Sequence, residues 1–99
     1  MTKMQNWRMQ GCAEVLIEQN DKLLALSKNA ANLPKIMLKN LKDTLSVVSS
    51  LLDLVGSYKP DSNISDEEIA RIRHRIGDLV VSVAMITIQI NEYRKTERS

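Results

Sequence analysis

The strongest structural signal in the chain is the segment Ile76-Gly77-Asp78-Leu79-Val80-Val81-Ser82-Val83-Ala84-Met85-Ile86, which is almost wholly apolar in its second half. The apolar run continues to Ile90 and belongs to a longer region that begins at Ser65. Ser65 and Glu68 have the spacing of a capping box, in which each side chain satisfies a free backbone N–H at a helix start. Acidic residues in the first turn also suit the positive end of the helix dipole. The sequence therefore predicts a helix over residues 65–93.

Apolar residues recur along this region at helical spacing. They are Ile69, Ile72, Ile76, Val80, Val83 and Ile90, with Met85 and Ile86 beside that line. The run 79–90 is also rich in Val, Ile and Thr, which leaves a strand as the alternative. A helix is favoured because the run is longer than an ordinary strand and contains no Gly or Pro. A helix that is apolar all round must be covered on every side, so we expect the most buried helix of an oligomer.

Length and composition favour one all-α domain spanning residues 1–99. The chain has no Phe, one Trp and two Tyr among many aliphatic residues, which suits helix-on-helix packing. Its formal charge of +2 is too small to imply a nucleic-acid or membrane partner. The single cysteine, Cys12, excludes an internal disulfide framework and a cysteine-based metal cluster.

The sequence shows neither a signal peptide nor a membrane-spanning segment. Residues 1–10 are polar and lack the apolar core of a signal peptide. The apolar run after Asp78 is about 12 residues long, whereas a bilayer requires about 20. We therefore expect a cytoplasmic protein without a membrane partner.

Two further helices are predicted, over residues 3–31 and 33–55. The first carries an apolar line and a second line beside it, and Gly11 is a place where it can begin. Asn32 and Pro34 are suited to the start of the second helix, and Gly56 to its end. The first helix has Cys12, Leu16, Leu23 and Ala30 on one line and Ala13, Ile17 and Leu24 on the other; the second has Leu38, Leu41, Leu45, Val48, Leu52 and Val55. The expected architecture is an oligomeric bundle built from three main helices.

Two charged groups are candidates for binding. Three carboxylates at i, i+4 and i+7 share a helix face, as a solvated surface or as ligands for Mg²⁺. Four lysines follow without an intervening carboxylate, as a solubilising face or as a contact for phosphates or an acidic partner. No aromatic residues interleave them, which makes nucleic acid an improbable partner. The carboxylates are Glu14, Glu18 and Asp21, and the lysines are Lys28, Lys35, Lys39 and Lys42.

Two segments together resemble the MazG-type nucleotide pyrophosphohydrolases, an all-α family. Residues 76–83, with Gly77-Asp78 before an apolar run, resemble its second conserved helix, and residues 16–23 resemble its Glu-Glu-x-x-Glu motif. The resemblance implies cleavage of a nucleoside triphosphate between its α and β phosphates by Mg²⁺ ions that carboxylates hold. Glu18 and Asp78 match motif acids, and a shifted register would add Glu14 and Asp21.

Three basic or neutral substitutions interrupt that pattern. Gln19 and Lys22 replace glutamates of the first motif, and Arg75 stands where the second motif has its Glu. Positive charge beside a metal site repels the metal, so the resemblance implies the scaffold of the family without its catalysis. Lys22, Arg71 and Arg75 are then candidates for direct contact with phosphates.

The sequence leaves three functions open. The first is a non-catalytic MazG-like oligomer that binds a nucleotide or another phosphorylated ligand, or that acts as a regulatory protein. The second is a small protein-binding inhibitor or antitoxin-like module that uses the lysine face. The third is a Mg²⁺-dependent nucleotide pyrophosphohydrolase, and only this function requires a cofactor. In each case we expect self-association into a dimer or a larger assembly.

Overall fold

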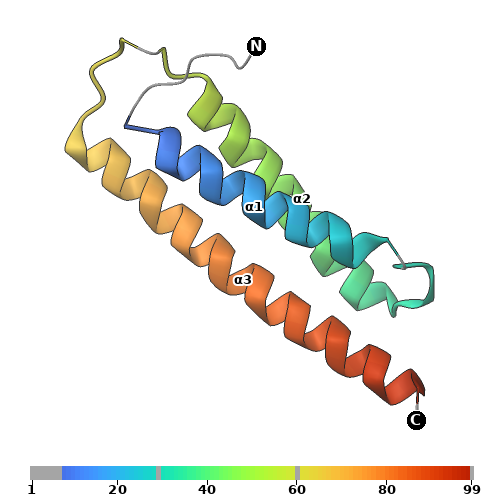
Figure 1. Ribbon diagram of the computed structural model, residues 1–99. Helices are drawn as coiled ribbons and strands as arrows, with labels where there is room; N and C mark the ends of the chain where they lie inside the picture. The colour runs from blue at the N-terminus through green and yellow to red at the C-terminus, as the bar shows by residue number, and fades with distance from the viewer. Residues whose placement is uncertain (1–7, 29, 60, 99) are drawn as a thin grey trace.

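The computed structural model describes residues 8–28, 30–59 and 61–98, and its architecture is all-α (Figure 1). It contains α1 (Gln10–Ser27), a 3₁₀ turn η1 (Ala30–Asn32), α2 (Lys35–Gly56) and α3 (Asp66–Arg98). No strand occurs in these ranges, and residues 79–90 are helical throughout. The predicted fold class is therefore confirmed, and the strand alternative for this run is wrong.

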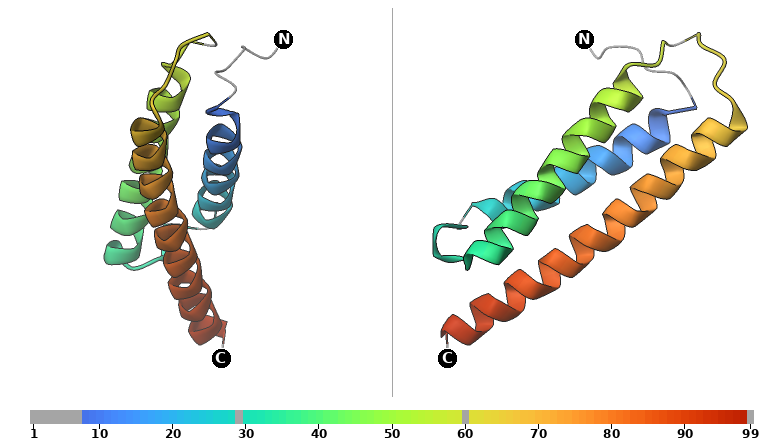
Figure 2. Two further views of the ribbon diagram at one scale, coloured as in Figure 1. Left: turned by 90° about the vertical axis from the view of Figure 1, so that its left-hand side faces the viewer. Right: turned by 180° about the vertical axis from the view of Figure 1, so that it is seen from behind.

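The three helices lie side by side with α1 and α3 parallel and α2 antiparallel to both (Figures 1 and 2). Arg8, just before α1, forms an ion pair with Asp66 at the start of α3. At the other end, the guanidinium of Arg94 donates a hydrogen bond to the carbonyl of Leu26, at 2.9 Å. The molecule is elongated, with extents of 54 × 30 × 17 Å. Its shortest dimension shows that the three helices form a thin body with much of each helix at the surface.

The core contacts α3 along one side only. Its buried residues repeat at alternating steps of three and four, the spacing of a coiled-coil seam. They are Ile69, Ile72, Ile76, Leu79, Val83, Ile86 and Ile90. Val80 was expected in the seam and Met85 beside it, but both are exposed. Leu79 takes the place of Val80, and Ile86, which was expected beside the seam, is buried in it. The apolar run 79–90 was expected to be covered on every side. Within this chain it is covered on one side only, because α1 and α2 both lie against the same seam.

The other two helices also differ from the predicted apolar lines. In α2 the buried residues are Leu41, Thr44, Val48, Leu51 and Val55. Thr44 and Leu51 thus replace Leu45 and Leu52, which are only half-buried. The buried face of α2 is shifted by about one residue because both α1 and α3 contact this helix. The hydroxyl of Thr44 donates a hydrogen bond to the carbonyl of Asn40, at 2.7 Å, which satisfies the buried polar group.

The first of the two lines predicted for the first helix is in the core at Cys12, Leu16 and Leu23, while Ala30, which lies in η1, is half-buried. In the second line Ala13 is buried, whereas Ile17 and Leu24 are exposed. A pair of neighbouring helices covers a limited arc of α1, and the side chains of Ile17 and Leu24 lie beyond it. The broad apolar stripe that the sequence predicts is therefore real, but the chain itself covers only part of it.

The helix boundaries differ from the predicted ones at all six ends, although the end of the second helix and the start of the third differ by only one residue. The first helix begins at Gln10, next to Gly11, and ends at Ser27 rather than residue 31; predicted helical positions 3–7 lie outside the described residues. The second begins at Lys35 with Pro34 at its N-cap, and it includes Gly56. The helix ends at Gly56, close to the predicted end, but no described glycine has a positive φ, so Gly56 is not a left-handed C-cap residue.

The third helix extends to Arg98, five residues beyond the predicted end at 93. Its last turns form hydrogen bonds with the end of α1 and with the connection between α1 and α2. The hydroxyl of Tyr93 donates a hydrogen bond to the carbonyl of Asn32, at 3.3 Å, and Arg94 donates to Leu26. These contacts join residues more than 60 positions apart in the sequence, so local pattern could not predict them.

The capping box of α3 is present in half of its usual form. The hydroxyl of Ser65 accepts a hydrogen bond from the backbone N–H of Glu68, at 3.2 Å. The carboxylate of Glu68 accepts a hydrogen bond from the hydroxyl of Tyr58. This bond, and to a lesser extent desolvation, raises the pKa of Tyr58 above its ordinary value of 10.0. The loop between α2 and α3 is thereby fastened to the first turn of α3.

Loss of the Tyr58 proton should weaken the fold at alkaline pH. Because its pKa is higher in the folded than in the unfolded chain, the hydrogen bond stabilises fully below pH 10.0 and is lost as pH rises through the folded-state pKa. We expect the Tyr58→Phe variant to lose up to about 1 kcal/mol at neutral pH, since the hydrogen bond to Glu68 is partly exposed to water. Urea unfolding and phenolate absorbance measure the two effects. A phenol that titrates below its ordinary pKa would contradict this assignment.

Candidate functional site

An apolar groove runs between α1 and the second half of α3. Its volume is about 570 Å³, and most of its lining is aliphatic. Residues from α3 form one wall and residues from α1 form the other, with Gln19, Lys22 and Thr87 as the polar members. The lining residues are Gln19, Lys22, Ala25, Leu26, Val80, Val83, Ala84, Thr87 and Ile88. An open apolar groove between two helices is the usual receptor for the apolar face of another helix.

Next to this groove lies a second apolar line on α3. We call it the outer stripe; it consists of Gly77, Val81, Ala84 and Ile88, with Met85 at its edge. The side chains of Val81, Met85 and Ile88 are 59%, 56% and 63% exposed, so the core does not use them. A Cβ atom built on Gly77 would have no atom within 4 Å, so the space above it is open. The spacing of four, three and four is again that of a helix-pairing seam.

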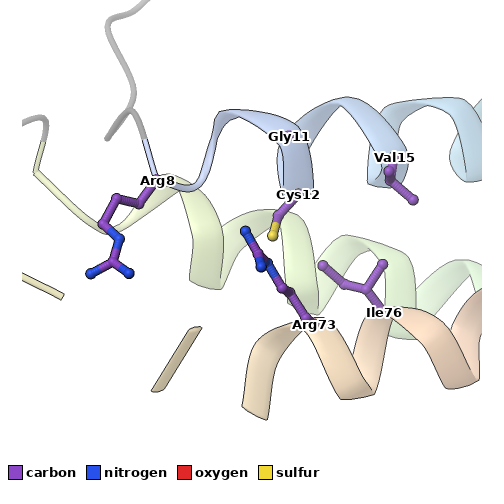
Figure 3. Close-up of a pocket in the computed structure, with 6 residues that line it drawn as sticks. All are labelled: Arg8, Gly11, Cys12, Val15, Arg73 and Ile76. Atoms are coloured by element: carbon purple, nitrogen blue, oxygen red, sulfur yellow. The ribbon is translucent and has the colours of Figure 1, made fainter. Parts of the chain in front are cut away.

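A smaller pocket of about 450 Å³ lies at the other end of the molecule, between the start of α1 and the first half of α3. Figure 3 shows Arg73 reaching from α3 towards Cys12, while the side chain of Arg8, from the residues before α1, points away from both at the edge of the pocket. Gly11, Val15 and Ile76 complete the lining. The N-cap residue of α1, Met9, makes no side-chain cap hydrogen bond, and the partial positive charge of the helix N-terminus lies at this end.

Arg8 is fixed in place by the start of α3. Its guanidinium donates hydrogen bonds to the carbonyl of Ile64, at 2.8 Å, and to the carboxylate of Asp66, at 2.5 Å. The bond from Arg8 lowers the pKa of Asp66 below its ordinary value. This pocket could not be predicted from the sequence, because Arg8 and Arg73 are 65 positions apart and neither belongs to a motif.

The structure does not bring the predicted phosphate-binding residues together. Lys22 lines the apolar groove and forms an ion pair with Glu18, at 3.6 Å. Arg71 and Arg75 are exposed on α3, nine and five residues before Val80 of the groove wall. At 3.6 residues per turn these positions lie about 180° and 140° around the helix from Val80. Arg71 and Arg75, about 40° apart around α3, thus share one side of that helix, whereas Lys22 lies in the groove on another side of the molecule.

The predicted metal ligands are also dispersed. Glu14, Glu18 and Asp21 are exposed on α1, and Asp78, exposed on α3, has a carboxylate oxygen 3.7 Å from Nε2 of His74. Within the described part of the chain, no group of three or more His, Cys, Asp or Glu residues is placed to hold a metal ion. The convergence of four carboxylates that the hydrolase alternative requires is therefore not found there.

The predicted lysine surface lies on the outside of the bundle. Lys35, Lys39 and Lys42 are exposed along α2, on the side that faces away from the buried seam, and Lys28 is exposed just after α1. Their arrangement agrees with a solvated face and leaves the predicted contact with an acidic partner as a prediction. Across the described helices, none combines the length and hydropathy needed to cross a membrane.

The resemblance to the MazG-type family remains a prediction drawn from residues 16–23 and 76–83. In the structure, Glu18 and Asp78 are each paired with a basic residue of their own helix, Lys22 and His74. Compared with family models, with curated proteins and with solved structures, the chain matches none of them.

Proposed function

We propose that the chain is a non-catalytic helical interaction protein, which binds an apolar helix over the outer stripe and the adjoining groove. One observation carries the proposal: α3 is apolar on two sides, and the core covers only one of them. Val80, Ala84 and Ile88 belong to the groove wall, and Val81 and Met85 continue the same surface outwards. A contiguous exposed apolar surface of this kind marks an interaction site.

The energy available from covering this surface is sufficient for specific binding. Full burial of a Val, Ile or Met side chain stabilises by about 1.5–3 kcal/mol. Val81, Met85 and Ile88 each retain more than half of their exposure, so each could contribute on the order of 1 kcal/mol on binding. The aliphatic wall of the groove would add to this sum. A partner helix therefore gains affinity from α3 without any rearrangement of the core.

Two measurements on the intact chain test the proposal. Sedimentation equilibrium determines the mass over a range of concentrations, and fluorescence anisotropy determines binding of a labelled amphipathic leucine–lysine peptide. We expect either self-association or saturable binding of the peptide, because either one covers the exposed side of α3. A chain that stays monomeric and also fails to bind the peptide would refute the proposal.

The pocket of about 450 Å³ that Arg8 and Arg73 line favours a second candidate function, the binding of a phosphorylated ligand. It lies beside the N-terminus of α1, and the apolar residues Val15 and Ile76 also line it. Guanidinium groups form strong, paired hydrogen bonds with phosphate oxygens. The ligand class is the one that the sequence predicts, but the proposed binding residues are Arg8 and Arg73 instead of Lys22, Arg71 and Arg75.

A thermal-shift assay with inorganic pyrophosphate and nucleoside triphosphates, without Mg²⁺, tests this second candidate. Ligands that bind only the folded chain raise its melting temperature. We expect the shift to disappear in Arg73→Gln and to persist in Arg75→Gln, which removes the same charge two residues further along α3, from another face of the helix. Equal shifts in both variants would mean that the anions bind by net charge alone, and no shift in the wild type would exclude the candidate.

A further inference from the structure

We infer that the partner of α3 is a second copy of this chain, paired antiparallel along the outer stripe. This inference rests on the proposed function and names its partner. In the pairing, Gly77 of one copy faces Ile88 of the other, and Val81 faces Ala84. The two outer stripes thus form a central helix pair, while α1 and α2 of each copy lie on its two outer sides.

The spacing of the outer stripe fits such a pair in size. Gly77 and Ala84 are small, Val81 and Ile88 are large, and all four are exposed. An antiparallel pair with its two-fold axis between residues 82 and 83 places each small residue opposite a large one. A small residue lets the facing side chain approach the helix backbone, which produces close packing. A parallel pair would place Gly77 against Gly77 and Ile88 against Ile88, leaving a void at one level and crowding at the other.

Charge favours the same orientation. The heptad spacing of the outer stripe continues to His74 and Ala70 towards one end and to Asn91 and Lys95 towards the other, and all four are exposed. In the antiparallel pair, Lys95 faces Ala70 and His74 faces Asn91. In the parallel pair, Lys95 would face Lys95 of the second copy, and like charges at such positions are destabilising.

The glycine in the middle of α3 supports a close approach of another helix. Glycine within a helix costs about 1 kcal/mol relative to alanine. Nothing within the described chain occupies the space beside Gly77, so its own fold gives no reason for the missing side chain. In the antiparallel pair that space receives Ile88 of the second copy.

The pairing would also cover exposed residues of the groove wall. Ala84 and Ile88 belong both to the outer stripe and to the groove wall. A helix seated on the outer stripe therefore lies along the mouth of the groove, next to Lys22 and Ala25 of α1. The seam from Ala70 to Lys95 spans about 38 Å at 1.5 Å per residue, which is a long contact for a small protein.

Distances between spin labels on the two copies test the orientation. Each label is attached to one new cysteine, at the exposed positions Ser82 or Arg71, in a Cys12→Ala background. Since the axis passes between residues 82 and 83, labels on Ser82→Cys should be within about 20 Å of each other. Labels on Arg71→Cys should be separated by at least about 35 Å, because 23 residues at 1.5 Å separate their levels along the pair.

A parallel pair predicts short distances at both positions and would overturn the inference. A wild-type chain that is monomeric at about 100 µM would also overturn it, while the peptide assay would still decide the proposed function. If the Cys12→Ala background fails to fold, the same labels can be placed on the wild-type chain, because the thiol of Cys12 is buried. Circular dichroism of each labelled variant shows whether the helices are retained.

Discussion

Replacing Leu16 by alanine should lower the free energy of unfolding by about 3 kcal/mol, whereas the same change at Leu24 should cost less than about 1 kcal/mol. Both leucines lie on α1, but Leu16 is 0% exposed and Leu24 is 47% exposed. The first change removes methyl and methylene groups from the centre of the core and leaves a cavity, because the neighbouring helices relax only partly. The second removes groups that already contact water.

The size of the Leu16 effect is large for this chain. Folded domains are stable by only about 5–15 kcal/mol, and a 99-residue chain buries a modest core. Urea unfolding followed by circular dichroism, at low micromolar concentration, measures both variants. Equal losses at Leu16 and Leu24 would show that the exposed line of α1 is buried under those conditions. A cost at Leu24 that grows with protein concentration would place α1 in the interface as well.

Replacing Ile88 by glutamate should weaken self-association at least about 100-fold while leaving the isolated chain folded. The side chain is 63% exposed in one chain, so a carboxylate there remains hydrated in the monomer. In the proposed pair the same carboxylate would be enclosed opposite Gly77 of the second copy. Burial of a charge without a partner costs several kcal/mol, and each 1.4 kcal/mol is a factor of ten in affinity.

The matched control for this variant is Ile36→Glu. Ile36 is also 63% exposed, but it lies in the first turn of α2, away from the outer stripe. Sedimentation equilibrium should therefore give the wild-type association constant for Ile36→Glu and a monomer for Ile88→Glu. Equal association constants for the two variants would show that self-association does not use the outer stripe. Thermal melts of both variants in dilute solution show whether either has lost its fold.

The helical content of the chain was predictable because its signals are local. Ser65 and the acidic residues after it marked the start of α3 to within one residue, and Pro34 and Gly56 bounded α2 closely. The alternation of apolar steps of three and four also predicted α2 and α3 as packing helices. These features depend on side chains within a few turns of each other, and no distant contact is needed to interpret them.

The exact seams were not predictable because the sequence offers more apolar positions than the chain can bury. Val80 and Leu79 are adjacent, and either could continue the line from Ile76. Only the positions of α1 and α2 select Leu79, just as they select Leu51 over Leu52. Likewise, the pairing of Arg8 with Asp66 and the closeness of Arg73 to Cys12 arise from the parallel packing of α1 and α3.

The predicted sites differed most from the structure, for the same reason. The sequence grouped Lys22, Arg71 and Arg75 by charge, but the turn of α3 separates the arginines from the groove that Lys22 lines. By itself the sequence determined that the chain is helical and that α3 carries more apolar surface than one seam requires. Only the tertiary structure decided which part stays exposed, because burial depends on where neighbouring helices lie, and that is set by contacts between residues far apart in the chain.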